Sequence, residues 1–99
     1  MNKIDYDTRA VVYRDAIVQY GHMAQTMVAI EEMSELTKEL CKLINRGGNN
    51  MDRVAEEIAD VTIMMEQLRI MYGINEEVCE HMDLKVERLH QRLIKADQG

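Results

Sequence analysis

Apolar residues recur every three or four positions along most of the chain, as they do on the buried face of a helix. Glycines interrupt this pattern at Gly21, at Gly47 and Gly48, and at Gly73. The segments between them predict four helices, over about residues 7–20, 22–46, 50–72 and 75–95. Gly21 either ends the first helix or bends it. Proline is absent and no run alternates apolar and polar residues, so the pattern predicts an all-α fold. We expect a single domain over residues 1–99, built as an antiparallel four-helix bundle that a second copy completes.

Two of the predicted helices each carry a short acidic segment. The second helix contains Glu31-Glu32-Met33-Ser34-Glu35, and the third contains Glu56-Glu57-Ile58-Ala59-Asp60. Each segment holds two carboxylates three residues apart, which places them on one helix face. Two such helices side by side would therefore gather four carboxylates, Glu32, Glu35, Glu57 and Asp60. Hard oxygen ligands of this kind suit Mg²⁺, with Mn²⁺ as a substitute.

The position of Glu57 separates this cluster from an ordinary solvated face, which is the commonest reason for neighbouring glutamates. The third helix has an apolar arc formed by Val54, Ile58, Val61, Met64, Met65, Leu68 and Met71. At about 100° per residue, Glu57 falls inside that arc, Asp60 lies at its edge and Glu56 lies outside it. A charge in an apolar stripe is unfavourable unless it is paired or bound to a metal. The pattern therefore favours a metal site at the seam between the two helices.

The last helix combines an apolar stripe with a basic strip. The stripe consists of Val78, Met82, Val86, Leu89 and Leu93, and the strip beside it consists of His81, Lys85, Arg88 and Arg92. Such a strip is either surface basicity that pairs with nearby glutamates of the same helix or a surface that binds phosphate. An acidic protein that binds phosphate has to concentrate its cations locally.

Charge and cysteine usage narrow the classes of partner. The formal net charge of −6 argues against a nucleic-acid partner, but a small phosphorylated ligand remains compatible if a cation is bound. Residues 1–5 form no apolar leader, and no apolar run approaches membrane-spanning length, so no membrane contact is expected. Cys41 and Cys79 lack metal-type spacing and are expected to be buried free thiols in a cytoplasmic protein.

The acidic segments resemble those of the all-alpha nucleotide pyrophosphohydrolases of the MazG type. That family carries Glu-Glu-x-x-Glu on one helix and Glu-x-x-Asp on the next, which correspond here to residues 31–35 and 57–60. Lys85-Val86-Glu87-Arg88 resembles the Lys-x-x-Arg of the family's last helix. The resemblance covers roughly residues 13–94. It departs at Asp83, where many members have Asn.

The resemblance implies a function and a role for each matching residue. Glu32, Glu35, Glu57 and Asp60 are expected to hold Mg²⁺. Glu31 or Glu35 is expected to accept a proton from the attacking water, and Lys85 and Arg88 to contact the triphosphate. The implied reaction hydrolyses a ribo- or deoxynucleoside triphosphate to the monophosphate and pyrophosphate, in nucleotide-pool house-cleaning.

Two other interpretations deserve comparison with this one. A ferritin-like di-iron bundle needs two Glu-x-x-His motifs, and the chain offers one, from Glu87 to His90. A non-catalytic helical interaction domain with the same fold is the stronger alternative. Under any of these interpretations we expect a homodimer or homotetramer. Ile63 and Ile70 lie opposite the main apolar arc of the third helix, so this helix has more apolar surface than a four-helix monomer needs to bury.

Overall fold

Four helices account for nearly all of the part of the chain, residues 6–98, that the computed structural model describes. They are α1 (Tyr6–Tyr20), α2 (His22–Arg46), α3 (Met51–Met71) and α4 (Asn75–Gln98). The described residues contain no strand, so the predicted all-α class is confirmed. None of the described helices is long and apolar enough to cross a membrane. The expectation for residues 1–5 lies outside the described residues.

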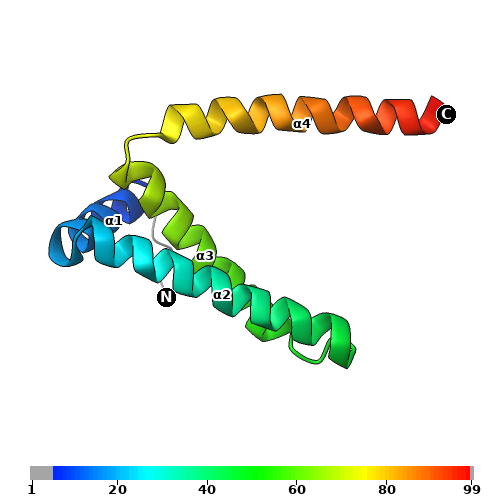
Figure 1. The fold of residues 1–99 in the computed structure, drawn as a ribbon. Coiled ribbons are helices and arrows are strands. Elements are labelled where there is room, and N and C mark those ends of the chain that lie inside the picture. The colour runs from blue at the N-terminus through cyan, green and yellow to red at the C-terminus, as the bar shows by residue number, and fades with distance from the viewer. Residues whose placement is uncertain (1–5, 99) are drawn as a thin grey trace.

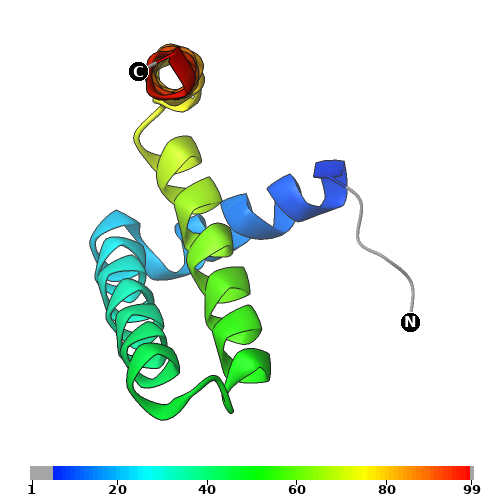
Figure 2. The ribbon, with the colours of Figure 1, turned by 90° about the vertical axis from the view of Figure 1, so that its right-hand side faces the viewer.

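The α2–α3 hairpin is the centre of the fold. The two helices run antiparallel and side by side, α1 crosses them at one end, and α4 leaves the end of α3 and extends away from the other three (Figures 1 and 2). The radius of gyration is 17.0 Å, whereas a compact chain of this length has about 13 Å. The single copy is therefore an open arrangement, with three packed helices and one projecting helix.

Three glycine positions separate the helices, as the sequence predicts. Gly21, with φ of +89°, lies between α1 and α2 and ends the first helix rather than bending it. Gly47, with φ of +79°, ends α2 in the left-handed conformation that favours glycine at a helix C-terminus. Gly73, with φ of +62°, lies in the turn between α3 and α4.

The buried core is small and lies mainly where α1 crosses the hairpin and along the hairpin seam. Its apolar members are Tyr13, Ile17, Ala29, Val54, Met64 and Met71. Many other large apolar residues are exposed, among them Ile30, Met33, Leu40 and Ile44 on α2 and, from the predicted apolar stripe of α4, Met82, Val86, Leu89 and Leu93. In the single copy, α4 packs along none of the other helices, so its apolar stripe stays open.

Polar residues are also buried in the seam between α2 and α3. Gln25 of α2 and Gln67 of α3 are both buried, and the Gln25 amide donates a hydrogen bond of 2.7 Å to the Gln67 side-chain oxygen. At the same end of the hairpin, the hydroxyl groups of Thr26 and Tyr72 lie 2.6 Å apart. These bonds fix how α2 and α3 align at the end of the hairpin next to α1.

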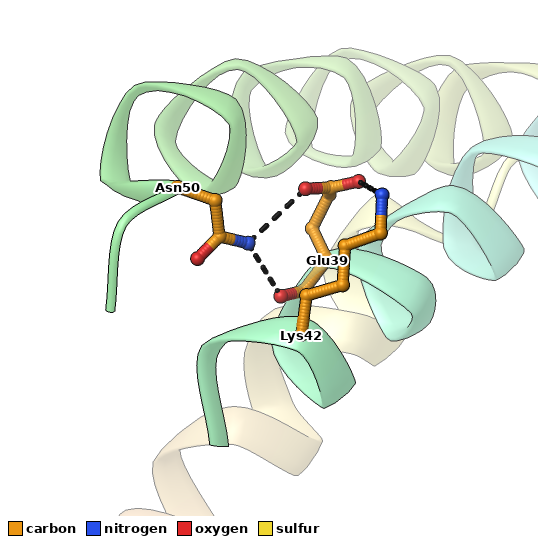
Figure 3. Close-up of polar contacts among 3 residues, drawn as sticks. All are labelled: Glu39, Lys42 and Asn50. Carbon is orange, nitrogen blue, oxygen red and sulfur yellow. Dashed lines mark hydrogen bonds and ion pairs between the residues drawn. The ribbon is translucent and has the colours of Figure 1, made fainter. Parts of the chain in front are cut away.

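At the other end of the hairpin, Glu39 joins α2 to the loop that precedes α3. Its side chain is only 3% exposed, and the Asn50 amide donates to its main-chain oxygen at 2.8 Å and to its carboxylate at 3.1 Å (Figure 3). Lys42 forms an ion pair with the same carboxylate at 3.2 Å. The Asn50 hydrogen bond is the main factor that lowers the pKa of Glu39, ahead of Lys42. Asn50 directly precedes α3, but its side chain makes no capping bond to that helix.

We expect Asn50→Ala to destabilise the protein, because a buried carboxylate and a main-chain oxygen would lose their donor. The thermal midpoint should fall by about 4 °C or more. Asn49→Ala, at the exposed neighbouring position, is the control and should change the midpoint little. Equal midpoints for the two variants, measured by circular dichroism, would show that the Glu39 contacts do not hold the hairpin.

Candidate metal centre

Three carboxylates meet in the middle of the hairpin seam. Glu32 of α2 and Glu57 and Asp60 of α3 each place one oxygen so that the three oxygens lie within 4.8 Å of one another. All three side chains are half-buried. The helices create this arrangement because Glu57 and Asp60 lie one turn apart on α3 and face Glu32 across the seam. The structure thus brings together three of the four carboxylates that the sequence assigns to a metal.

Glu35 and Glu31 lie further out. Glu35 is exposed and does not belong to the group of three, although its charge acts on both Glu32 and Glu57. Glu31 is exposed on the outer side of α2. Both side chains are accessible to solvent.

The electrostatics of the cluster disfavour three negative charges. Burial raises the pKa of Glu32, and the charges of Asp60 and then Glu57 raise it further. Burial likewise raises the pKa of Glu57, followed by the charges of Asp60 and Glu35. One carboxylate oxygen of Glu57 is inaccessible to solvent and has no hydrogen-bond partner. Buried polar atoms are almost always paired, so this oxygen is short of a partner.

No lysine or arginine of the described residues lies within ion-pair distance of the cluster. The one ion pair in that part of the chain joins Lys42 to Glu39. A divalent cation at the centre of the three oxygens would supply the missing positive charge, and carboxylate oxygens are the ligands that Mg²⁺ prefers. The donor set and the unpartnered Glu57 oxygen therefore fit a hard divalent cation.

The basic residues assigned to phosphate binding are not near the carboxylates in the single copy. Lys85 and Arg88 lie in the middle of α4, which projects away from the hairpin, and both are exposed (Figure 1). Cys41 and Cys79 are free, but they are exposed, so the expectation of buried thiols is wrong.

Two hollows lie outside the cluster, and the sequence did not predict either. A groove of about 990 Å³ runs between α1, the end of α3 and the start of α4, and Tyr13 and Glu66 contribute to its lining. Burial and the neighbouring Glu66 raise the pKa of Tyr13 to about 12. A smaller hollow of about 340 Å³ at the hairpin tip is lined by Glu39, Lys42, Arg46, Asn49, Asn50 and Arg53. Neither hollow is lined by the three clustered carboxylates.

Arg53 of the smaller hollow lies one helical turn before Glu57 on α3. The sequence contained a signal for this neighbourhood, namely a cation four residues from a candidate ligand on the same helix face.

Comparison with family models, curated proteins and solved structures finds no match for this chain. The resemblance to the MazG type therefore rests on the acidic and basic segments themselves.

We expect the stability of the metal-free protein to depend on pH in a way that identifies the cluster. Because the folded-state pKa values of Glu32 and Glu57 are raised, the folded state binds more protons than the unfolded state above the ordinary value of 4.5. Their contribution to the free energy of unfolding is therefore present below pH 4.5 and is lost as the pH rises through their folded-state pKa values. Glu39 has the opposite sign, and its contribution is lost as the pH falls below 4.5.

Urea unfolding in a chelator between pH 5 and pH 8 measures this effect. The wild type should lose stability across that range, and Glu57→Gln should lose clearly less, because one member of the repulsive cluster has become neutral. Identical pH profiles for the two proteins would mean that the carboxylates do not interact in solution.

Two adjacent glutamates provide a second test with a built-in control. Glu57→Gln should abolish Mg²⁺ binding while the stability of the metal-free protein is kept or improved, because a half-buried charge is removed from the cluster. Glu56→Gln, at the exposed neighbouring position, should keep Mg²⁺ binding and change stability by at most about 0.5 kcal/mol. Calorimetric titration with Mg²⁺ distinguishes the two, and equal affinities would remove Glu57 from the ligand set.

Proposed function

We propose that this chain is a Mg²⁺-dependent nucleoside triphosphate pyrophosphohydrolase of the MazG type, and that it acts as a homo-oligomer. The observation that carries the proposal is the convergence of Glu32, Glu57 and Asp60 from two helices, without an ion pair to a lysine or arginine of the described residues and with one Glu57 oxygen buried and unpartnered. The order and spacing of the acidic segments in residues 31–35 and 57–60 support the same conclusion.

The proposal assigns the carboxylates of the cluster as the metal ligands. Glu32, Glu57 and Asp60 would hold Mg²⁺, and Glu35, whose charge acts on Glu57, would complete the set or act through a coordinated water. When bound, Mg²⁺ supplies positive charge to the phosphate oxygens and makes a nearby water more acidic. Mn²⁺ has similar ligand preferences and is expected to substitute for it.

Side chains of the chain itself would accept the proton of the attacking water and bind the phosphates. Glu31 or Glu35 accepts the proton of the water as its oxygen bonds to phosphorus. The bond between the α-phosphate and the pyrophosphate breaks, so the products are a nucleoside monophosphate and pyrophosphate. Lys85 and Arg88 hold the negative charge of the triphosphate, as cations do in phosphoryl transfer generally. The reaction needs no covalent nucleophile, so neither cysteine has a role in it.

A panel of ribo- and deoxynucleoside triphosphates tests the reaction. With Mg²⁺, at least one member should give equal amounts of monophosphate and pyrophosphate, and a chelator should stop the reaction. Release of orthophosphate and a nucleoside diphosphate would contradict the reaction class. Hydrolysis of no member, with no change in thermal midpoint on adding Mg²⁺, would favour a non-catalytic interaction domain.

The role of the basic strip has its own test. The double variant Lys85→Ala and Arg88→Ala should lower kcat/KM by about tenfold or more, because it removes two charges that contact phosphate. Mg²⁺ affinity in the absence of nucleotide should not change, since neither residue lies near the carboxylates of its own copy. Full activity of the double variant would assign these residues to the solvated surface.

A further inference from the structure

The larger groove, on the side of α3 that faces away from the carboxylate cluster, contains buried polar groups that the proposed reaction does not use. It has a volume of about 990 Å³ and lies between α1, the end of α3 and the start of α4. Glu66 lines it and is nine residues after Glu57. At about 100° per residue, this separation places the two side chains on opposite sides of the helix. The groove is therefore separate from the candidate metal centre.

Tyr13 of α1 and Glu66 of α3 each bring an unpaired polar atom to this groove. Tyr13 is 6% exposed, and its buried hydroxyl group has no hydrogen-bond partner among the described residues. The Oε2 atom of the half-buried Glu66 is unpaired as well. Burial and then the nearby Glu66 raise the pKa of Tyr13 to about 12, yet no hydrogen bond joins the two side chains. Buried polar atoms are nearly always paired, so two neighbouring atoms here both lack a partner.

Acidic side chains line the groove at two places. Glu66 lies on α3, whereas Glu76 and Glu77 lie in the first turn of α4. No ion pair joins any of the three to a lysine or arginine of the described residues. These charges repel an anion, whereas a positively charged donor forms a strong hydrogen bond with a carboxylate. The unpaired Glu66 oxygen therefore favours a cation as the occupant of the groove.

Two arginines also line the groove, and one of them already has partners. Arg69 donates from its Nε to the Asn75 side-chain oxygen at 2.8 Å and from a terminal nitrogen to the Cys79 sulfur at 3.1 Å. These contacts keep the guanidinium at the junction between α3 and α4. Arg14 is exposed on α1, where salt screens its charge. The carboxylate of Glu66 thus has no cationic partner among the described residues.

We propose that the groove binds an aliphatic amine with two ammonium groups, one between Tyr13 and Glu66 and the other at the acidic first turn of α4. An ammonium group has three N–H donors, and the Tyr13 oxygen and the Glu66 Oε2 atom can both accept from it. Ala10, Val11 and Ile70 supply apolar surface to the same groove, which suits the methylene chain between the ammonium groups. The two acidic places in the groove are the reason for two ammonium groups.

Such a ligand joins two helices that are separate in the free protein. Among the described residues, α1 makes no contact with α4, and the groove lies between them. A diamine in the groove touches α1 through Tyr13 and α4 through its first turn. Because it binds the folded chain only, it should raise the thermal midpoint in proportion to its affinity.

Calorimetric titration with putrescine, an aliphatic diamine of four carbons, tests the site. The wild type should bind one equivalent per chain. Butylamine has the same chain but one ammonium group, so it should bind at least about tenfold more weakly. Glu66→Gln should weaken putrescine binding by at least about tenfold, because the ammonium group loses its charged acceptor.

Two control variants separate the groove from other acidic surfaces. Glu80→Gln removes the same charge from an exposed position of α4 outside the groove and should change the affinity by less than about twofold. Glu57→Gln, in the carboxylate cluster, should bind putrescine as the wild type does. Circular dichroism should show that all three variants are folded.

Tyr13→Phe tests the hydroxyl group by a measurement that needs no ligand. The ring stays in the core, and the unpaired hydroxyl is removed. The thermal midpoint of the free protein should therefore hold or rise, while putrescine binds more weakly. A clear fall in the midpoint would show that the hydroxyl has a partner in the free protein, and would overturn the site.

Three results of the titrations would also overturn the proposal, and none depends on hydrolysis of a nucleotide. The first is no binding of putrescine at millimolar concentration, which would leave water as the partner of Tyr13 and Glu66. The second is equal weakening by Glu66→Gln and Glu80→Gln, which would mean general attraction to a chain with a net charge of −6. The third is loss of binding in Glu57→Gln but not in Glu66→Gln, which would place the amine at the carboxylate cluster.

Discussion

The repulsion between Glu32, Glu57 and Asp60 is the constraint on which the account of this protein depends. Three carboxylates whose oxygens lie within 4.8 Å destabilise the seam that holds the central hairpin together. Polar or apolar residues at the same positions would pack without this cost. A bound cation changes the sign of the interaction, so that the same three charges join α2 to α3. With a cation bound, the cluster would stabilise the α2–α3 seam that it destabilises in the metal-free protein.

The rest of the seam is suited to holding this cluster in place. A buried amide pair, Gln25 and Gln67, lies at one side of it along the hairpin, and the Glu39–Asn50 contacts lie at the other. Each of these polar contacts is satisfied only when α2 and α3 are aligned in one way, since a slip along the axis would leave buried groups unpaired. Alignment by hydrogen bonds at both ends keeps the carboxylates opposite one another even while they repel. Apolar packing alone, with a core this small, would fix the alignment less well.

The sequence was sufficient to predict the four helices, their breaks at glycine and the position of Glu57 relative to Glu56, because these depend on local preference and on helical period. It was insufficient for the burial of Gln25, Glu39 and Gln67, since each is stabilised by a partner that is distant in the chain or across a loop. The direction of α4 was equally inaccessible, because it depends on Arg69 reaching across the turn to Asn75 and Cys79. Helices α2 and α4 are both amphipathic, but many of their apolar residues are exposed to solvent in the single copy.

Proton release on metal binding is the measurement that tests the central claim most directly. Because the pKa values of Glu32 and Glu57 are raised, protons compete with Mg²⁺ for these carboxylates, and the competition grows as the pH falls. Calorimetric titrations with Mg²⁺ near pH 5.5, in two buffers with different ionisation enthalpies, report the number of protons released. The account predicts saturable binding with proton release near pH 5.5 and less release near pH 8. Saturable binding without proton release at either pH, or no binding at millimolar Mg²⁺, would contradict it.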